Sequence, residues 1–87
     1  MYLIIVYDIA IERVNKINRF LKQYLNWIQN SVFEGEVTKS QYKQIKNRIN
    51  DIINTKYDSI IIFEASHKNL VEKTIIGIEK GKVDRFL

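Results

Sequence analysis

The chain contains no cysteine, which excludes disulfide bonds and thiolate metal sites and is typical of a protein from the reducing cytoplasm. It also lacks proline and has only three glycines, so no flexible hinge or low-complexity linker divides its 87 residues. A chain this short holds one hydrophobic core. We therefore expect residues 1–87 to form a single cytoplasmic domain. Its small size favours stabilisation by a partner chain, most simply in a homodimer.

Several motifs of known chemistry are missing as well. Neither a GxxxxGK[ST] loop nor a glycine-rich dinucleotide turn is present, and His67 has no cysteine, serine nucleophile or second histidine near it in sequence. The apolar run at residues 2–7 ends at Asp8 and is far shorter than the roughly 20 residues that cross a membrane. These absences argue against phosphate-loop chemistry, against a nucleophilic triad and against a membrane partner.

Positive charge is concentrated in one part of the chain. Fourteen Lys and Arg against ten Asp and Glu give a formal charge of +4. Residues 13–48 contain eight basic and two acidic side chains, a local excess of about +6 that favours a polyanionic partner. The basic residues with helical spacing either follow nucleic-acid phosphates or simply solvate exposed helix faces; they are Lys16, Arg19, Lys22, Lys39, Lys43 and Lys46.

Hydrophobic periodicity predicts an α+β domain. Residues 2–7 and 60–63 are continuously apolar, as in strands covered on both faces, and residues 13–28 have the spacing of an amphipathic helix. Thr38 and Gln41 form a capping-box pattern before a second helix, which residues 54–57 end. This order predicts a ferredoxin-like βαββαβ sandwich. We expect its first and last strands to be parallel neighbours at the sheet centre, with Asp8 and Glu64 at one end.

Two segments leave the strand layout open. Residues 27–37 read either as two strands or as one bent strand, because only Asn30-Ser31 offers a turn or bulge. Residues 74–78 have the composition of an additional strand, and the basic tail that follows ends in an apolar pair, Phe86 and Leu87. Such a tail often pairs with a sheet edge.

Asp8 is the sharpest local signal in the sequence, because it directly follows six apolar strand residues. A carboxylate at this place is most often a turn residue or a helix cap, and less often a metal ligand. Mg²⁺ usually takes one or two carboxylates together with waters and substrate phosphates, so a lone Asp8 needs a symmetry-related copy. Aromatic residues such as Phe33 either stack on bases or pack the core, and their spacing favours the core.

Several stretches taken together resemble the CRISPR-associated endoribonuclease two family, the small subunit of spacer acquisition. They are Val6-Tyr7-Asp8-Ile9 followed by Arg13 and Lys16, the run Gln29-Asn30-Ser31-Val32-Phe33-Glu34-Gly35-Glu36-Val37, the strand Asp58-Ser59-Ile60-Ile61-Ile62, and Gly77 before the tail. The resemblance implies a ferredoxin-like homodimer whose C-terminal segment, residues 74–87, packs on the partner protomer. It also implies a larger CRISPR integrase subunit as a second partner.

The resemblance assigns roles to single residues. Asp8 matches the family's metal-binding and catalytic aspartate, with Mg²⁺ or Mn²⁺ held between the two protomers. Tyr7, Arg13 and Ser31 match family motif positions and are expected at the nucleic acid, where Arg13 contacts phosphate and Ser31 donates a hydrogen bond. We place Lys16 and Arg19 there as well. Interface roles are expected for Phe33, Phe86 and Leu87.

The implied activity is metal-dependent phosphodiester hydrolysis, on single-stranded RNA or on double-stranded DNA, within the CRISPR adaptation module. In such a reaction the ion activates water and neutralises phosphate charge, so no nucleophilic side chain is needed. Two alternatives stay open. One is a non-catalytic scaffold that holds a DNA duplex and bridges integrase subunits, and the other is a toxin-type messenger-RNA nuclease on the same fold.

Overall fold

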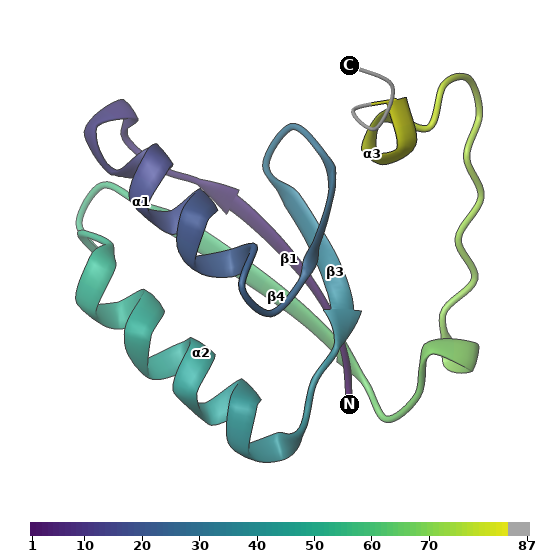
Figure 1. The fold of residues 1–87 in the computed structure, drawn as a ribbon. Helices are drawn as coiled ribbons and strands as arrows, with labels where there is room; N and C mark the ends of the chain where they lie inside the picture. Colours follow the sequence, from purple (N-terminus) through teal and green to yellow (C-terminus); the bar gives the residue numbers. More distant parts are fainter. Residues whose placement is uncertain (84–87) are drawn as a thin grey trace.

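Two helices cover one face of a four-stranded sheet, as Figure 1 shows for this computed structural model. The structure describes the backbone of residues 1–83 and the side chains of residues 1–81. The elements are β1 (Tyr2–Asp8), α1 (Ile11–Leu21), β2 (Asn26–Gln29), β3 (Val32–Glu36), α2 (Lys39–Ile52), β4 (Ser59–Ala65), the 3-10 turn η1 (Lys68–Leu70) and α3 (Lys80–Val83). The α+β, ferredoxin-like prediction is confirmed.

The strands are ordered β2-β3-β1-β4, and every neighbouring pair is antiparallel. The expectation of parallel first and last strands at the sheet centre is therefore wrong, although β1 and β4 are neighbours. The reason lies in the connections. Helix α2 connects β3 to β4 as a crossover, so β4 runs parallel to β3. Because β3 is antiparallel to β1, β4 is antiparallel to β1 as well, and it forms the edge of the sheet.

The antiparallel register separates the two strand-end acids. Asp8 pairs with Ser59 at one end of the sheet, whereas Glu64 pairs with Leu3 near the other end. Along β1 these positions are five residue steps apart, about 17 Å at the usual rise. Glu64 instead faces Tyr42 of α2. Burial of Tyr42 is the larger cause that raises its pKa to about 12, and a hydrogen bond to the Glu64 carboxylate is the second cause. The two acids therefore do not form one site.

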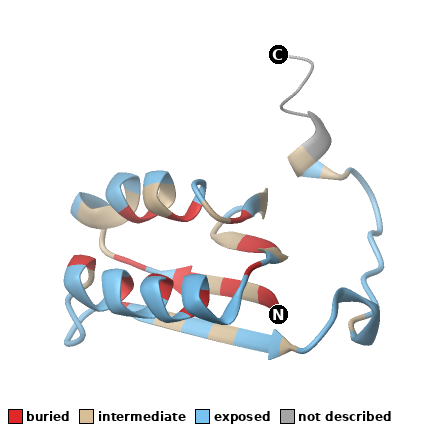
Figure 2. Cartoon of the chain, turned by 60° about the horizontal axis from the view of Figure 1, so that its bottom comes forward, coloured by how far each residue is buried: buried red, intermediate tan, exposed pale blue. Residues whose placement is uncertain are grey.

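The core lies between the sheet and the two helices, where Figure 2 shows the buried segments in red. Alternate residues of β1 point into it, with Leu3 and Ile5 fully buried. The helices add the apolar stripes expected from their spacing, namely Ile17 and Leu21 from α1 and Tyr42, Ile45, Ile49 and Ile52 from α2. Burial of these side chains is the main stabilising contribution to the fold.

The start of α2 shows how local sequence fixes an element. The Gln41 amide donates to the Thr38 hydroxyl oxygen over 3.0 Å, and the Thr38 amide donates to the Gln41 side chain over 2.9 Å. Both helix-end amides are thus satisfied by side chains, and the predicted capping box is confirmed.

In the described part of the chain, neither α1 nor α2 covers the other face of the sheet. On this open face Ile61 and Phe63 of β4 are 52% and 58% exposed. A strand covered on both faces was expected here from the continuous apolar run, and that expectation is wrong within the single chain. An apolar face of this kind is characteristic of an interaction surface.

The remaining segments settle the open strand layout. Residues 26–36 form two strands, β2 and β3, because Asn30 adopts a positive φ of 44° in the turn between them. Residues 72–79 form neither strand nor helix in this chain, so no strand is found at 74–78. Figure 1 shows this segment running beside the sheet rather than within it. Phe86 and Leu87 lie outside the described residues.

Candidate metal and nucleic-acid site

A small pocket lies where β1 ends. It has a volume of about 310 Å³ and is lined by Tyr7, Asp8, Ile9, Val14, Asn30 and Ser31. The turn between β2 and β3 is held against β1 because the Tyr7 amide donates to the Ser31 carbonyl oxygen over 3.0 Å. Three residues singled out from the sequence, Tyr7, Asp8 and Ser31, are therefore brought together in one pocket.

The Asp8 side chain is exposed at this pocket. Within residues 1–81 its carboxylate has no side-chain hydrogen bond or salt bridge. The helix-cap alternative is wrong, since the N-cap of α1 is Ala10, two residues further on, and no side chain caps that end. Asp8 is thus an anionic oxygen donor directed to solvent at the end of a rigid strand, which is the kind of ligand that Mg²⁺ and Mn²⁺ take.

Tyr7 and Phe33 are buried, as their places in the apolar pattern favoured, and lie deeper than the roles implied by the family resemblance. Tyr7 is 6% exposed, and its ring stacks on Phe33 with centroids 6.3 Å apart, while its hydroxyl accepts a weak hydrogen bond from Asn18 over 3.4 Å. Phe33 is fully buried between sheet and helices. The expectation that Phe33 shapes an interface is corrected, because its side chain packs the core of its own chain. A nucleic-acid contact by Tyr7 stays a prediction.

Arg13 is held by a carboxylate that the sequence did not reveal as its partner. Its Nε and Nη2 atoms donate to the two oxygens of Asp58 over 2.6 and 2.9 Å, a bidentate pair. The backbone amides of Ala10 and Asn54 donate to the same carboxylate over 2.9 and 2.8 Å. Asp58 therefore joins the loop after Asp8, helix α1 and the turn before β4. We call this arrangement the Asp58 clamp.

The charge state of the clamp follows from these contacts. The Arg13 hydrogen bond, opposed by burial and aided by the two backbone amides, holds the pKa of Asp58 well below its usual range. The same hydrogen bond raises the pKa of Arg13. With its Nη1 also donating to Glu12 over 3.2 Å, Arg13 directs its nitrogens at carboxylates of its own chain. Its role as a phosphate ligand stays a prediction. Forty-five residues separate it from Asp58, so no local pattern could have paired them.

Lys16 and Arg19 are not in the Asp8 pocket. Both lie further along α1, exposed, beside Arg48 of α2 in a separate groove. Arg48 was missed by the sequence argument because it does not follow the spacing of the other α2 cations.

The donors at the pocket fit a metal ion only in part. Asp8 offers one carboxylate, and the residues described include no group of three or more His, Cys, Asp or Glu side chains able to enclose an ion. This donor set suits Mg²⁺, which is commonly bound by one or two carboxylates with waters and substrate phosphates completing the shell. Asp8 would hold such an ion with its one carboxylate, and waters, substrate phosphates or a further carboxylate would complete the shell.

Fold and site together define a small α+β protein of ferredoxin-like topology with an exposed strand-end aspartate and a positively charged helical layer. No helix in the described part of the chain is long and apolar enough to cross a membrane. Comparison with known proteins identifies the family to which this α+β protein belongs.

A family model described as CRISPR associated protein Cas2 matches residues 1–73. A CRISPR-associated endoribonuclease Cas2 of Methanocaldococcus jannaschii is 50% identical over 87 residues, covering all of this chain and 76% of that protein. The protein of the same name from Pyrococcus furiosus is 42% identical over the full length of both chains. A solved structure titled as a crystal structure of Cas2 has a TM-score of 0.84 at 42% identity, over 92% of this chain and 90% of that one. The chain belongs to the CRISPR-associated Cas2 family.

Proposed function

We propose that this protein is a metal-dependent endonuclease of CRISPR adaptation, in which Asp8 holds Mg²⁺ or Mn²⁺ against the phosphate to be hydrolysed. The observation that carries the proposal is the exposed Asp8 carboxylate, unpaired by any described side chain, at the mouth of a pocket that Tyr7 and Ser31 also line. Relatives at 42–50% identity bear the name endoribonuclease, which supports RNA as the substrate, and we propose single-stranded RNA.

The proposed hydrolysis needs no nucleophilic side chain. A divalent ion at Asp8 supplies charge neutralisation on the phosphate and lowers the pKa of water, which makes a nucleophile without serine, cysteine or histidine. Asp8 would hold such an ion at a fixed place, because it ends a strand that is hydrogen-bonded on both sides. Ser31 and Asn30 line the same pocket and offer hydrogen bonds to the substrate. The Asp58 clamp keeps the β1–α1 loop in place beside Asp8.

The proposal includes a homodimer, for which the open face of the sheet is the surface. Ile61 and Phe63 expose an apolar patch there, and Ile75, Ile76 and Ile78 add exposed apolar side chains in the segment that follows. A second copy would supply a second Asp8 as a further carboxylate for the ion. A larger integrase subunit is the further partner we propose, in the integration of new spacers.

The test compares wild type with Asp8→Asn, which keeps the size of the side chain and removes its charge. Labelled single-stranded RNA and double-stranded DNA are incubated with Mg²⁺, Mn²⁺ or a chelator, after sedimentation has established the oligomeric state. We expect cleavage by wild type only with metal, and a rate lower by roughly 100-fold or more in the variant, because a lost ligand removes several kcal/mol of transition-state stabilisation.

Asp51→Asn is the matched control, since it removes the same charge from an exposed aspartate of α2 that does not line the pocket. Equal cleavage by the Asp8 and Asp51 variants would contradict the proposal. Absence of cleavage by every protein, with duplex binding intact, would favour the second candidate function, a DNA-holding scaffold. The positively charged helical layer is the observation that supports that alternative.

A further inference from the structure

A second pocket adjoins the Asp8 pocket at the turn between β2 and β3. It has a volume of about 320 Å³ and is lined by Trp27, Gln29, Asn30 and Lys80. We call it the Trp27 pocket. Asn30 lines both pockets, so they meet at this one turn residue. A group bound in one pocket is therefore a near neighbour of a group bound in the other.

Two segments far apart in the sequence build the Trp27 pocket. β2 is an edge strand of the sheet, and its pairing with β3 shifts register between Trp27 and Gln29. Such a bulge re-aims side chains and is common beside functional sites. Helix α3 lies against the same strand, because a Cβ atom on Gly81 would be 2.7 Å from the Trp27 carbonyl oxygen, and only glycine allows this close approach. Lys80, the residue before it, thereby reaches the pocket.

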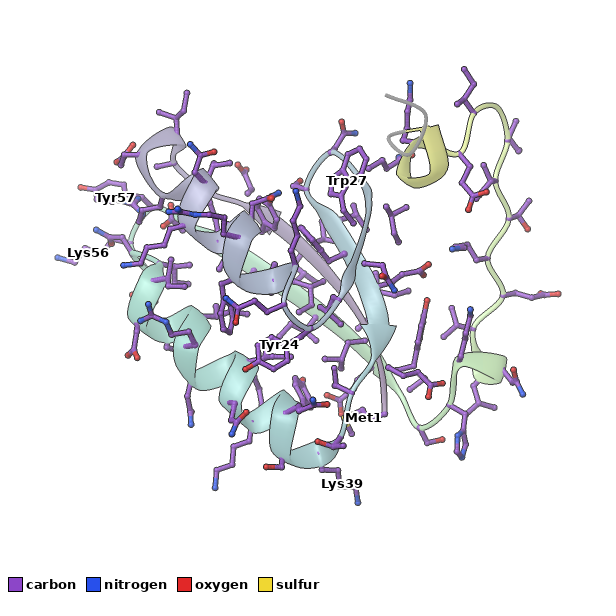
Figure 3. All side chains as sticks on the ribbon, in the orientation of Figure 1. Met1, Tyr24, Trp27, Lys39, Lys56 and Tyr57 are labelled. Carbon is purple, nitrogen blue, oxygen red and sulfur yellow. The ribbon has the colours of Figure 1, made fainter. Side chains whose placement is uncertain are left out.

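The Trp27 side chain is held in place before any ligand binds. Its indole Nε1 donates to the Asn30 carbonyl oxygen over 3.0 Å, which ties the ring to the turn beside it (Figure 3). The residue is only partly buried against the core, so part of its surface stays open to solvent. A flat ligand that stacks on a ring already fixed in this way costs little side-chain entropy.

The lining of the Trp27 pocket matches the chemistry of a nucleobase. Aromatic side chains stack on the face of any base. The amides of Gln29 and Asn30 both donate and accept hydrogen bonds, as the edges of bases do, and both residues are exposed. Among the described residues that line the pocket, none is acidic and one, Lys80, is basic. The volume is near the lower end for small-molecule sites, which suits a single ring system.

We propose that the Trp27 pocket binds one unpaired base of the nucleic-acid strand whose phosphate lies at Asp8. Trp27 stacks on the face of that base, and Gln29 and Asn30 form hydrogen bonds with its edge. The inference rests on the proposed function for the strand itself. It adds a contact that selects single strands, because the bases of a duplex are already stacked and paired.

Trp27 is the one tryptophan of the chain, so its fluorescence reports on the pocket. The full chain is titrated in chelator, so that nothing is cleaved, with a single strand of about ten nucleotides and with an abasic strand of the same length. We expect the normal strand to quench the emission and to bind at least about five-fold more tightly than the abasic strand, as for one stacked base. Both strands carry the same phosphates, so contacts to phosphate cancel in this ratio.

Variants assign the preference to the pocket. Gln29→Ala removes one amide from it, and Gln44→Ala is the matched control, because it removes the same group from an exposed position of α2 outside the pocket. Gln29→Ala should bind the normal strand about three-fold more weakly and the abasic strand unchanged, as for one lost hydrogen bond. Trp27→Phe should keep most of the preference for the normal strand, since phenylalanine also stacks, and Trp27→Ala should lose it. Circular dichroism verifies that each variant is folded.

Four results would overturn the proposal. The first is equal quenching by the normal and the abasic strand, and the second is an equal effect of Gln29→Ala and Gln44→Ala. The third is quenching by a duplex of the same sequence as strong as that by the single strand. The last is equal quenching by nucleoside monophosphates at the same nucleotide concentration, because the pocket would then be a site for free nucleotides.

These measurements are independent of cleavage. Quenching that depends on the base, without metal-dependent hydrolysis, would contradict only the nuclease proposal. Cleavage that depends on Asp8, without quenching that depends on the base, would contradict only the role of the Trp27 pocket.

Discussion

The two faces of the sheet differ in what covers them. On the helical side Leu3, Ile5 and Phe33 are fully buried within one chain, whereas on the open side Phe63 is 58% exposed although it belongs to an equally apolar run. The helical side also carries most of the cations, and the open side carries the paired acids of β3. The helical face of the sheet is thus covered within the chain, and the open face has the character of a surface for a partner.

On both sides of the sheet, a buried carboxylate has its hydrogen-bond partners within the chain. Asp58, on the border of the helical layer, is satisfied by four hydrogen bonds from Arg13, Ala10 and Asn54. On the open face the Tyr2 hydroxyl donates to Glu34, which also pairs with Lys73. Burial raises the pKa of Glu34, but the bonds from Lys73 and Tyr2 outweigh it and leave that pKa lowered. Lys73 thereby ties the C-terminal segment to the sheet.

The same substitution on both faces gives the largest expected contrast. Phe33→Ala should lower the free energy of unfolding by about 3–5 kcal/mol, the usual cost of a cavity in a close-packed core. Phe63→Ala should cost less than about 1.5 kcal/mol in dilute solution, because more than half of that side chain is already in water. Urea denaturation at two protein concentrations measures both.

Only the Phe63 cost should grow with protein concentration, since the open face is the proposed dimer surface. Equal costs for the two variants at every concentration would show that the faces do not differ.

Breaking the Asp58 clamp should have the next largest effect. Asp58→Asn removes the charge that Arg13 neutralises and should lower Tm by several degrees at pH 7. The folded pKa of Asp58 lies below its unfolded value of about 3.9, so its stabilisation is complete above that value. It is lost as the pH falls from there towards the folded pKa. Tm measured from pH 7 to pH 2 should therefore fall less steeply in the variant.

Parallel Tm curves for wild type and Asp58→Asn over that range would contradict the assignment. Asp51→Asn provides the comparison, because this substitution removes the same formal charge from an exposed side chain.

The smallest effect is expected on the open face. Tyr2→Phe removes the hydroxyl that donates to buried Glu34 and should cost about 1 kcal/mol of unfolding free energy, with Lys73 still pairing the carboxylate. Tyr57→Phe, at a site 78% exposed in the turn after α2 (Figure 3), should change stability by a few tenths at most. Urea midpoints separate the two, and a cost at Tyr2 no larger than at Tyr57 would deny the hydrogen bond a stabilising role.

Local signals in the sequence predicted the elements correctly where neighbouring residues determine them. The capping box at Thr38 and the stripe of Ile45 and Ile49 depend only on residues within one helix, and both were found. The strand-end position of Asp8 likewise follows from the residues directly before it. The extended region was ambiguous because its turn depends on Asn30 alone, whose positive φ no pattern requires.

Properties that join distant residues were decided by the tertiary structure. The separation of Asp8 from Glu64 and the pairing of Arg13 with Asp58 depend on strand order and register, which crossover connections set over tens of residues. The groove beneath Arg48 exists only because α1 and α2 pack side by side.

By itself, the sequence determined the two long helices, the two apolar strands and the acid at the end of β1, because helical and strand periodicity and capping act between near neighbours. Only the tertiary structure decided which face of the sheet is covered, which cations are paired with carboxylates and which are left to solvent. Those outcomes depend on long-range packing and on burial, since a charge is neutralised or left to solvent according to what the fold places beside it.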